Sequence, residues 1–212
     1  MLNVDRLKLT YGRETILNGV SFQVQAGEVV GLIGANGAGK SSIIEIIAGV
    51  LRPTAGSVTL YDVPLQRRRD YQKMIGFVPQ TIALTMHLTG RENVRQWGAL
   101  KGLSGDALKR EVERVGELCN LGDFWHKRIT AQSGGMQRRI NIAAGLIGSP
   151  RLLLLDEPTA GLDKESRAQI LTAIENIKKT GVMVILSNHD DGEQAQVTDR
   201  QFLLQEGLLC DV

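Results

Sequence analysis

The segment that most constrains this chain is a short run of small residues that ends in a lysine and a serine: Gly34, Ala35, Asn36, Gly37, Ala38, Gly39, Lys40 and Ser41. It matches the pattern G-x-x-x-x-G-K-[ST], for which a chance match in a chain of this length is about one in a hundred. A short apolar run at 29–33 precedes it, and a segment of helical character at 42–50 follows it. The sequence therefore predicts a buried strand, a phosphate-binding loop and a helix in succession.

Such a loop offers a phosphate group many backbone donors. Its glycines let successive N–H groups turn inward, and the N-terminus of the following helix adds positive potential. We expect the loop, with Ser42, to bind the nucleotide, Lys40 to reach its β- and γ-phosphates, and Ser41 to hold Mg²⁺. The alternative is an ordinary glycine-rich turn, which the strand–helix context disfavours.

Strand and helix patterns alternate at both ends of the chain but not in its middle. Short apolar or alternating runs predict strands at 7–11, 29–33, 57–61, 74–78, 152–155 and 182–186, and a closing hairpin at 202–209. From about 88 to 146 the apolar spacing is helical. We therefore predict an α/β fold with a mainly parallel sheet, formed by a core at 1–83 and 150–212 and a helical subdomain inserted at 84–149, in a single domain.

Two adjacent acids follow the apolar run at 152–155. A buried strand would deliver Asp156 and Glu157 to its carboxyl end, where the ligands of such sheets bind. Asp156 would bind Mg²⁺ through water, and Glu157 would be the general base for the attacking water. A solvated acidic turn is about as probable for this pair alone. The phosphate-binding loop favours the catalytic interpretation.

A second anion-binding helix start is predicted at Ser133, Gly134 and Gly135. Ser133 is a good N-cap, and the glycines let backbone N–H groups approach an anion closely. Because one nucleotide cannot easily occupy two helix N-termini in one small core, we expect two copies of the chain to share nucleotides head to tail. The alternative is a capped helix with a flexible entry.

Composition narrows the class of protein. The chain has 212 residues, 42% of them hydrophobic, and a formal net charge of +2, so we expect no nucleic-acid partner. Its apolar runs are shorter than a membrane span, its amino terminus does not follow the plan of a signal peptide, and it has 2 cysteines. We expect a cytoplasmic protein that reaches a membrane only through a partner chain.

Taken together, the motifs resemble those of the nucleotide-binding subunits of ATP-binding-cassette (ABC) transporters. The resemblance spans almost the whole chain, and its elements stand in the family's order: Gly34–Ser41, Gln80, Ser133–Gly135, Asp156-Glu157, Gly161-Leu162-Asp163 and His189. It implies ATP as the nucleotide and a P-loop NTPase core of the ABC type. An N-terminal antiparallel β subdomain and an inserted α-helical subdomain are also implied.

The resemblance assigns a role to each matching position. Tyr11 resembles the aromatic residue that stacks on adenine, although it could be a plain strand residue. Gln80 resembles the glutamine that contacts the metal and the attacking water. Ser133 and Gly135 would touch the γ-phosphate bound by the opposite copy. Asp163 resembles the acid that couples the two sites, or is only a helix N-cap. His189 resembles the histidine that holds the γ-phosphate and positions the base.

Two positions depart from the family's pattern. Its signature usually begins with leucine and has glutamine fifth, whereas this chain has Gln132 and Met136. We expect ATP contact across the dimer to persist, with an altered geometry or turnover rate. The surrounding sequence is similar to the branch that energises exporters of drugs, antibiotics, haem or polysaccharides.

The resemblance also implies partners. A transmembrane permease subunit on a separate chain would dock near residues 80–100, on the inner face of the cell membrane. The ATP-dependent dimer would be a homodimer or a heterodimer with a related subunit. The alternatives are a soluble ABC ATPase that acts on ribosomes or DNA and a nucleotide sensor that does not hydrolyse ATP.

Overall fold

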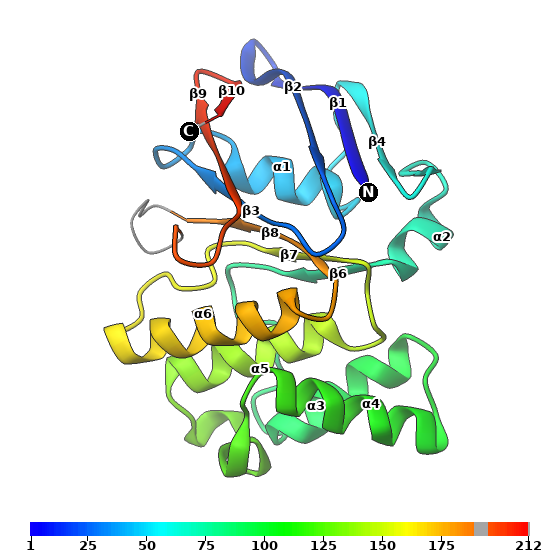
Figure 1. Cartoon of the computed structure of the whole chain (residues 1–212), viewed down its shortest axis with the longest axis vertical. Helices are drawn as coiled ribbons and strands as arrows, with labels where there is room; N and C mark the ends of the chain where they lie inside the picture. Colours follow the sequence, from blue (N-terminus) through cyan, green and yellow to red (C-terminus); the bar gives the residue numbers. More distant parts are fainter. Residues whose placement is uncertain (189–194, 212) are drawn as a thin grey trace.

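The computed structural model describes residues 1–188 and 195–211. Two sheets and a set of helices form its layers (Figure 1). The strands are β1 Leu2–Tyr11, β2 Glu14–Val24, β3 Val29–Ile33, β4 Ala55–Leu60, β5 Val63–Pro64, β6 Ile75–Val78, β7 Leu152–Leu155, β8 Met183–Ser187, β9 Arg200–Gln205 and β10 Leu208–Asp211. The helices are α1 Lys40–Ile47, α2 Arg68–Lys73, α3 Gly90–Leu100, α4 Gly105–Leu118, α5 Gly134–Leu146 and α6 Lys164–Lys178, with short 3₁₀ turns η1 Gly122–His126 and η2 Ile129–Ala131.

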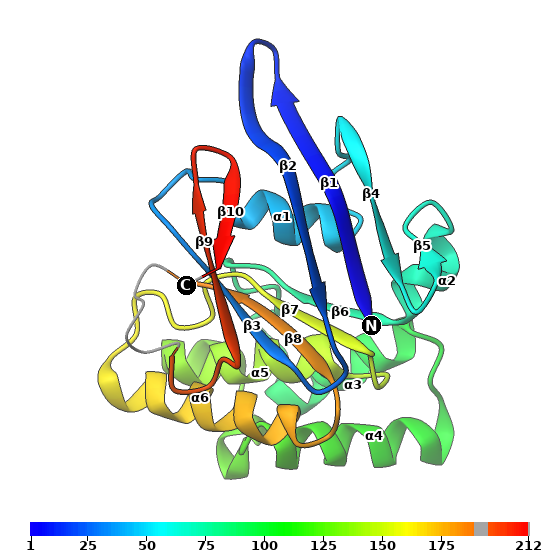
Figure 2. The same ribbon diagram turned by 45° about the horizontal axis from the view of Figure 1, so that its top comes forward.

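The N-terminal sheet is antiparallel. Its strand order is β2-β1-β4-β5, and every pair in it runs antiparallel. Helix α1 lies between this sheet and the second one (Figure 2). Because α1 is covered on both sides, its apolar residues Ile43, Ile44, Ile46 and Ile47 are fully buried. The antiparallel β subdomain expected from the family resemblance is therefore present.

The second sheet is mainly parallel and separates two cores. Its order is β10-β9-β3-β8-β7-β6, with only the β9–β10 pair antiparallel among the described strands. Successive side chains of a strand point to opposite faces. One face packs against α1 and the N-terminal sheet through Val30, Leu32, Leu152, Leu154 and Ile185. The other face packs against the helices through Val29, Leu153, Leu155, Val184 and Leu186.

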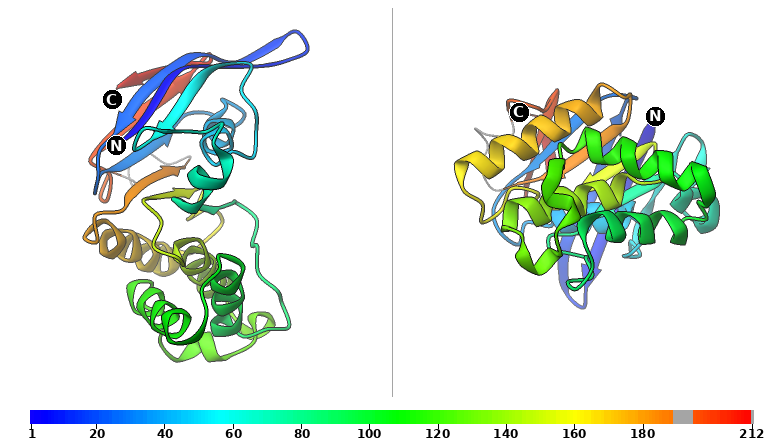
Figure 3. Two further views of the ribbon diagram at one scale, coloured as in Figure 1. Left: turned by 90° about the vertical axis from the view of Figure 1, so that its right-hand side faces the viewer. Right: turned by 90° about the horizontal axis from the view of Figure 1, so that it is seen from below.

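Helices α5 and α6 lie against that second face of the parallel sheet, and α3 and α4 pack on the side of these two helices that is away from the sheet (Figure 3). They share one continuous apolar core with the strands, so the helical segment between β6 and β7 is packed on the sheet and has no separate core of its own. The fold class is therefore confirmed, and the subdomain boundaries at 84 and 149 stay a prediction. Within the described ranges, no helix has the length and apolar run that crossing a bilayer requires.

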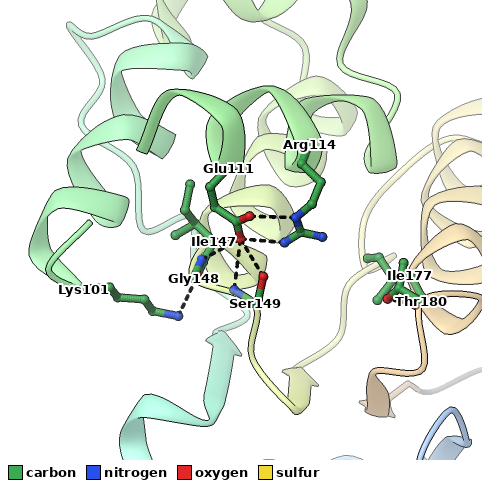
Figure 4. Close-up of polar contacts among 8 residues, drawn as sticks. All are labelled: Lys101, Glu111, Arg114, Ile147, Gly148, Ser149, Ile177 and Thr180. Atoms are coloured by element: carbon green, nitrogen blue, oxygen red, sulfur yellow. Dashed lines mark hydrogen bonds and ion pairs between the residues drawn. The ribbon is translucent and has the colours of Figure 1, made fainter. Parts of the chain in front are cut away.

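Polar contacts fasten the far end of α5 to the helices around it (Figure 4). Glu111 of α4 accepts hydrogen bonds from the backbone N–H groups of Gly148 and Ser149, each at 3.0 Å, and from Arg114 at 2.6 Å. Lys101, which follows α3, donates to the carbonyl of Ile147 at 2.8 Å. The turn between α5 and β7 is thus held by α3 and α4.

The phosphate-binding loop starts its helix earlier than the sequence pattern indicates. Helix α1 begins at Lys40 because Gly39, with φ 105°, is its N-cap. It ends at Ile47, close to Gly49, which has φ 73°. Left-handed glycines at both boundaries therefore define a helix shorter than the predicted 42–50 segment.

Candidate active site

Three parallel strands bring the predicted site together. Strand β3 pairs with β8, and β8 pairs with β7, all in the same direction. Their carboxyl ends therefore lie at one edge of the sheet, which is where ligands of such sheets bind. The loop from Gly34 follows β3, Asp156 follows β7, and Ser187 is the last residue of β8. Segments more than a hundred residues apart in the chain meet here because the strands are neighbours.

The loop has the backbone conformation that its glycines predict. Gly34, Gly37 and Gly39 have φ values of 144°, 78° and 105°, which L side chains rarely adopt. A Cβ at Gly34 would stand 2.5 Å from the carbonyl oxygen of Leu204. Alanine at this position would therefore force β9 away from the loop.

Lys40 is held inside the loop. Its Nζ donates to the carbonyl oxygens of Gly34 at 2.6 Å and of Ala35 at 3.0 Å, and the residue is 4% exposed. Burial lowers the pKa of Lys40 below its ordinary value, while the carboxylates of Glu157 and Asp156 act in the opposite direction. The Lys40 ammonium group thus lies inside the loop and interacts electrostatically with the carboxylates of Glu157 and Asp156.

Asp156 is fixed by two hydroxyl groups. Ser41 Oγ lies 3.0 Å from Asp156 Oδ1, and Ser187 Oγ donates to the same oxygen at 2.7 Å. Carboxylate, hydroxyl and amide oxygens are the donors that Mg²⁺ prefers, and Ser41, Asp156 and Gln80 supply one of each kind. The residues present therefore fit a magnesium ion bound together with a nucleotide.

Glu157 stands beside the predicted metal ligands in a strained backbone conformation. Its φ is 47°, and its N–H donates to Ser187 Oγ at 2.9 Å. Gln80 Nε2 donates to Glu157 Oε2 at 2.6 Å, and Glu157 is 8% exposed. A non-glycine residue at positive φ persists only where its surroundings impose it. The Ser187 hydroxyl, which accepts from this N–H, supplies such a constraint on the backbone of Glu157.

A cleft of about 360 Å³ opens beside these groups. It is lined by Tyr11, Ile16, Asn36, Gly37, Gly39, Lys40, Ser41, Ser42, Gln80 and Glu157. Tyr11, at the end of β1, is 54% exposed and so has a free ring surface. Tyr11, the phosphate-binding loop and the Glu157 carboxylate thus surround one space. The stacking of Tyr11 on adenine stays a prediction.

The Ser133 motif lies elsewhere on the molecule. Ser133 caps α5, its Oγ accepting from the Met136 N–H at 3.3 Å. Ser133 and Gly134 are exposed, whereas Gly135 is buried, and a Cβ on it would meet Ser166 Oγ at 2.4 Å. Within the described ranges, the residues that line the cleft do not include this motif. Within one chain, the N-terminus of α1 and the N-terminus of α5 therefore lie at separate places.

Asp163 is a helix N-cap in this structure. It accepts from the Ser166 N–H at 2.9 Å and from the Ser166 hydroxyl at 2.8 Å, and these hydrogen bonds hold the pKa of Asp163 below its ordinary value. Ser166 also packs on Gly135. The capped N-termini of α5 and α6 thus touch, and the proposed coupling role of Asp163 is not tested by this contact.

The unusual Gln132 has a structural role. It is 8% exposed, and its Nε2 donates to the carbonyls of Lys127 at 2.7 Å and Phe124 at 3.2 Å. It therefore fastens the η1 turn to the start of α5, which a leucine would not do. Met136, the second departure, is half-buried.

One predicted site residue lies outside the described residues, and one contact in the site was not predicted from the sequence. His189 belongs to the segment 189–194, of which nothing is described. Ser187 contacts both acids, yet its role was not predicted. The signal was a fully buried polar residue at the end of an otherwise apolar strand, beside the loop that follows β3.

Comparison with known proteins shows the family of this chain. A family model described as ABC transporter matches residues 17–160. The linearmycin resistance ATP-binding protein LnrL of Bacillus subtilis (strain 168) is 40% identical over 209 residues, which are 98% of this chain and 67% of that protein. The Nod factor export ATP-binding protein I of Rhizobium meliloti (strain 1021) is 36% identical over 97% of this chain and 62% of its own length. The chain thus spans about two thirds of the length of these relatives.

A solved structure is similar to the whole of this chain. The dimeric structure of a post-hydrolysis state of the ATP-binding cassette MJ0796 bound to ADP and Pi has a TM-score of 0.87 and 26% identity to this chain. The match covers 100% of this chain and 98% of that one. The phosphate-binding loop, the paired acids and these likenesses lead to one conclusion: the chain belongs to the ABC transporter family, as one of its ATP-binding and ATP-hydrolysing cassettes.

Proposed function

We propose that this cassette powers export across a membrane through a permease on a separate chain, by closing on ATP as a head-to-tail dimer. The observation that carries the proposal is the separation of two anion-directed helix starts. Lys40, Ser41 and Glu157 surround one cleft, while Ser133 and Gly134 are exposed outside it. The names of the two relatives, which speak of resistance and export, support the direction of transport.

The side chains around the cleft support a mechanism for ATP hydrolysis. Glu157 accepts a proton from a water molecule, whose oxygen attacks the γ-phosphorus while the bond to the β-phosphate oxygen breaks. The products are ADP and inorganic phosphate. Gln80, which already donates to Glu157 Oε2 at 2.6 Å, keeps the base and the water in place. His189 would hold the γ-phosphate.

The phosphate charge is balanced by the loop and its lysine. Backbone N–H groups at the start of α1 and the Lys40 ammonium stabilise the charge that develops on the γ-phosphate oxygens. A magnesium ion held by Ser41, Asp156 and Gln80 would supply further electrostatic stabilisation. Ser187, through its bond to Asp156 Oδ1 at 2.7 Å, orients that carboxylate.

The second copy completes the enclosure of ATP. The first N–H groups of a helix have no partner inside it, so the N–H of the exposed Gly134 is available to a phosphate. In a symmetric dimer each copy would supply its loop to one nucleotide and its α5 N-terminus to the other. Hydrolysis then removes the γ-phosphate that links the copies, and the dimer opens.

A groove between the sheet and the helices fits the permease. It measures about 320 Å³ and is lined by Ile75, Phe77, Pro79, Ala83, Trp97, Lys101, Asn141, Ala144 and Gly145. Nearby apolar side chains are exposed, Trp97 at 39% and Leu100 at 71%. Exposed apolar surface of this kind marks interaction sites. We propose that a short helix of the permease docks here, which places the cassette on the cytoplasmic face of the membrane.

The test of this function is whether the groove holds the chain at a membrane. Trp97→Glu should release the chain from the membrane fraction of its host and leave its Kd for ATP unchanged. Tyr61→Glu, a change at a comparably exposed aromatic residue in the turn between β4 and β5, is the matched control. Membrane association of Trp97→Glu at the parent level, or sedimentation of the parent with ribosomes, would contradict the proposal.

A further inference from the structure

A buried arginine on α5 reaches the active site although hydrolysis as described does not use it. Arg138 is 7% exposed, and its Nη1 donates to the carbonyl oxygens of Gln80 at 2.6 Å and Pro79 at 3.3 Å. Burial lowers the pKa of Arg138, and the carboxylates of Asp156 and Glu157 oppose that shift. The guanidinium therefore lies within electrostatic reach of both acids.

The residue that Arg138 holds by its backbone is the one that contacts the base. The Gln80 side chain donates to Glu157 Oε2 at 2.6 Å. A second contact lies one turn further along α5, where Asn141 Oδ1 accepts from the Ala83 N–H at 3.2 Å. Arg138 and Asn141 thus fasten the segment 79–83 to α5 at both of its ends.

Close packing makes this attachment stiff. A Cβ on Gly145 of α5 would stand 2.5 Å from Val78 Cγ2, and a Cβ on Gly76 would stand 2.2 Å from the Gly145 carbonyl oxygen. Helix α5 therefore lies directly on β6, the strand that leads into Gln80. A displacement of α5 must move this strand end or break its contacts.

The same helix begins with the motif that is exposed to the second copy. Ser133 and Gly134 stand at the N-terminus of α5, just over one turn before Arg138. We propose that Arg138 is a positioning residue for hydrolysis, which sets the Gln80 amide on Glu157 and links that contact to the position of the α5 N-terminus. The inference rests on the proposed function, since it presupposes that Glu157 is the base.

The neighbouring arginine provides a matched control. Arg139 is also 7% exposed, but its Nη1 donates to the Asn120 carbonyl at 2.8 Å and its guanidinium lies 4.6 Å from the Phe124 ring centroid. It therefore attaches α5 to the connection between α4 and η1. Loss of either arginine removes a buried cation from the same helix, and only loss of Arg138 frees Gln80.

The first measurement separates binding from turnover in the purified chain. Arg138→Gln should lower kcat for ATP hydrolysis by about 10- to 100-fold, because misplacement of a catalytic contact by an ångström has effects of this size. The Kd for ATP should stay within about twofold, since the loop is untouched. Arg138→Lys should recover part of kcat, and Arg139→Gln should keep kcat at the parent level.

A double-mutant cycle decides whether Arg138 acts through Gln80. If it does, Arg138→Gln added to Gln80→Ala should lower kcat no further, whereas a general structural effect would multiply the two losses. Hydrogen–deuterium exchange gives a readout that does not depend on turnover. Amides of residues 80–83 should exchange faster in Arg138→Gln and at the parent rate in Arg139→Gln.

The outcomes distinguish a failure of the positioning role of Arg138 from a failure of the proposed function. Multiplicative losses of kcat, or unchanged amide exchange at 80–83 in Arg138→Gln, would overturn the positioning role. Normal hydrolysis by Glu157→Gln would instead refute the proposed base, and with it the function on which this inference depends. Non-additive losses together with faster local exchange support the role of Arg138.

Discussion

The N-termini of α1 and α5 look alike in sequence and differ in their surroundings. Each follows glycine or serine residues that suit an anion. The start of α1 lies beside a buried lysine and two buried carboxylates, and Lys40 and Glu157 line a cleft there. The start of α5 presents Ser133 and Gly134 on the surface.

This difference indicates separate roles for the two helix starts. The α1 start is suited to bind a nucleotide, and the α5 start is suited to cover a nucleotide that is bound elsewhere. A phosphate at α1 would meet the Lys40 cation, the proposed metal site and the proposed base. A phosphate at α5 would meet backbone N–H groups and one hydroxyl, whose attraction is modest in water. We therefore propose that α1 of one copy serves binding and catalysis, and that α5 of the other copy serves dimer closure.

The largest effect is expected at α1. Lys40→Ala removes the cation that reaches the β- and γ-phosphates, so turnover should fall by about 1000-fold or more. Steady-state phosphate release measures it, with Lys73→Ala, a change at an exposed lysine of α2, as the control. Turnover near the parent rate in Lys40→Ala would remove α1 as the binding site.

Glu157→Gln should separate binding from chemistry. It removes the base but keeps the shape of the side chain, so hydrolysis should slow by about 100- to 10,000-fold while ATP still binds. Dimers should then accumulate with ATP in size-exclusion chromatography. If Glu157→Gln elutes as a monomer at saturating ATP, closure on uncleaved nucleotide is refuted.

A smaller effect, confined to association, is expected from Gly134→Asp. An acid in the first turn of α5 suits the helix dipole, so the thermal midpoint should not fall, but its charge should repel the γ-phosphate of the other copy. ATP binding to the monomer should persist while the ATP-dependent dimer weakens by about tenfold or more. Gly135→Ala is the contrasting change, because its Cβ would meet Ser166 Oγ at 2.4 Å and should destabilise the fold itself.

Tyr11 tests how far the α1 site extends. If its ring stacks on adenine, Tyr11→Ala should weaken ATP binding by about 1–3 kcal/mol, as is typical of stacking on a base. Tyr11→Phe keeps the ring and should bind ATP like the parent. Isothermal titration measures both, and equal affinities of the two variants would mean that Tyr11 is a plain strand residue.

The weakest effect concerns the far end of α5. Burial acts to raise the pKa of Glu111, but hydrogen bonds from Arg114, Ser149 and Gly148 bring it below its ordinary value. The stability from this ionised group is therefore present above about pH 4.3, the unfolded value, and is lost as the pH falls further. Glu111→Gln should cost about 1–2 kcal/mol at pH 7, and the difference from the parent should shrink in acid unfolding curves.

Sequence predicted the α1 site better than the α5 site for a physical reason. The order of strands and the glycine loop are local patterns, and parallel pairing then brings Lys40 and Asp156 to one edge. The burial of Gly135 under Ser166 and the reach of Arg138 to Gln80 depend on how helices pack, which spacing along one segment does not encode. Ser187 was missed because its partners follow a neighbouring strand, and its own segment does not encode that contact.

The central claim, that each nucleotide is held between the α1 start of one copy and the α5 start of the other, is tested most directly by mixing two defective variants. Both carry Glu157→Gln; one adds Lys40→Ala and keeps its α5 start, and the other adds Gly134→Asp and keeps its loop. Sedimentation velocity with ATP and Mg²⁺ should show dimers in the mixture and monomers in each variant alone. A mixture that stays monomeric, or a Gly134→Asp variant that dimerises alone as well as its parent, would contradict the account.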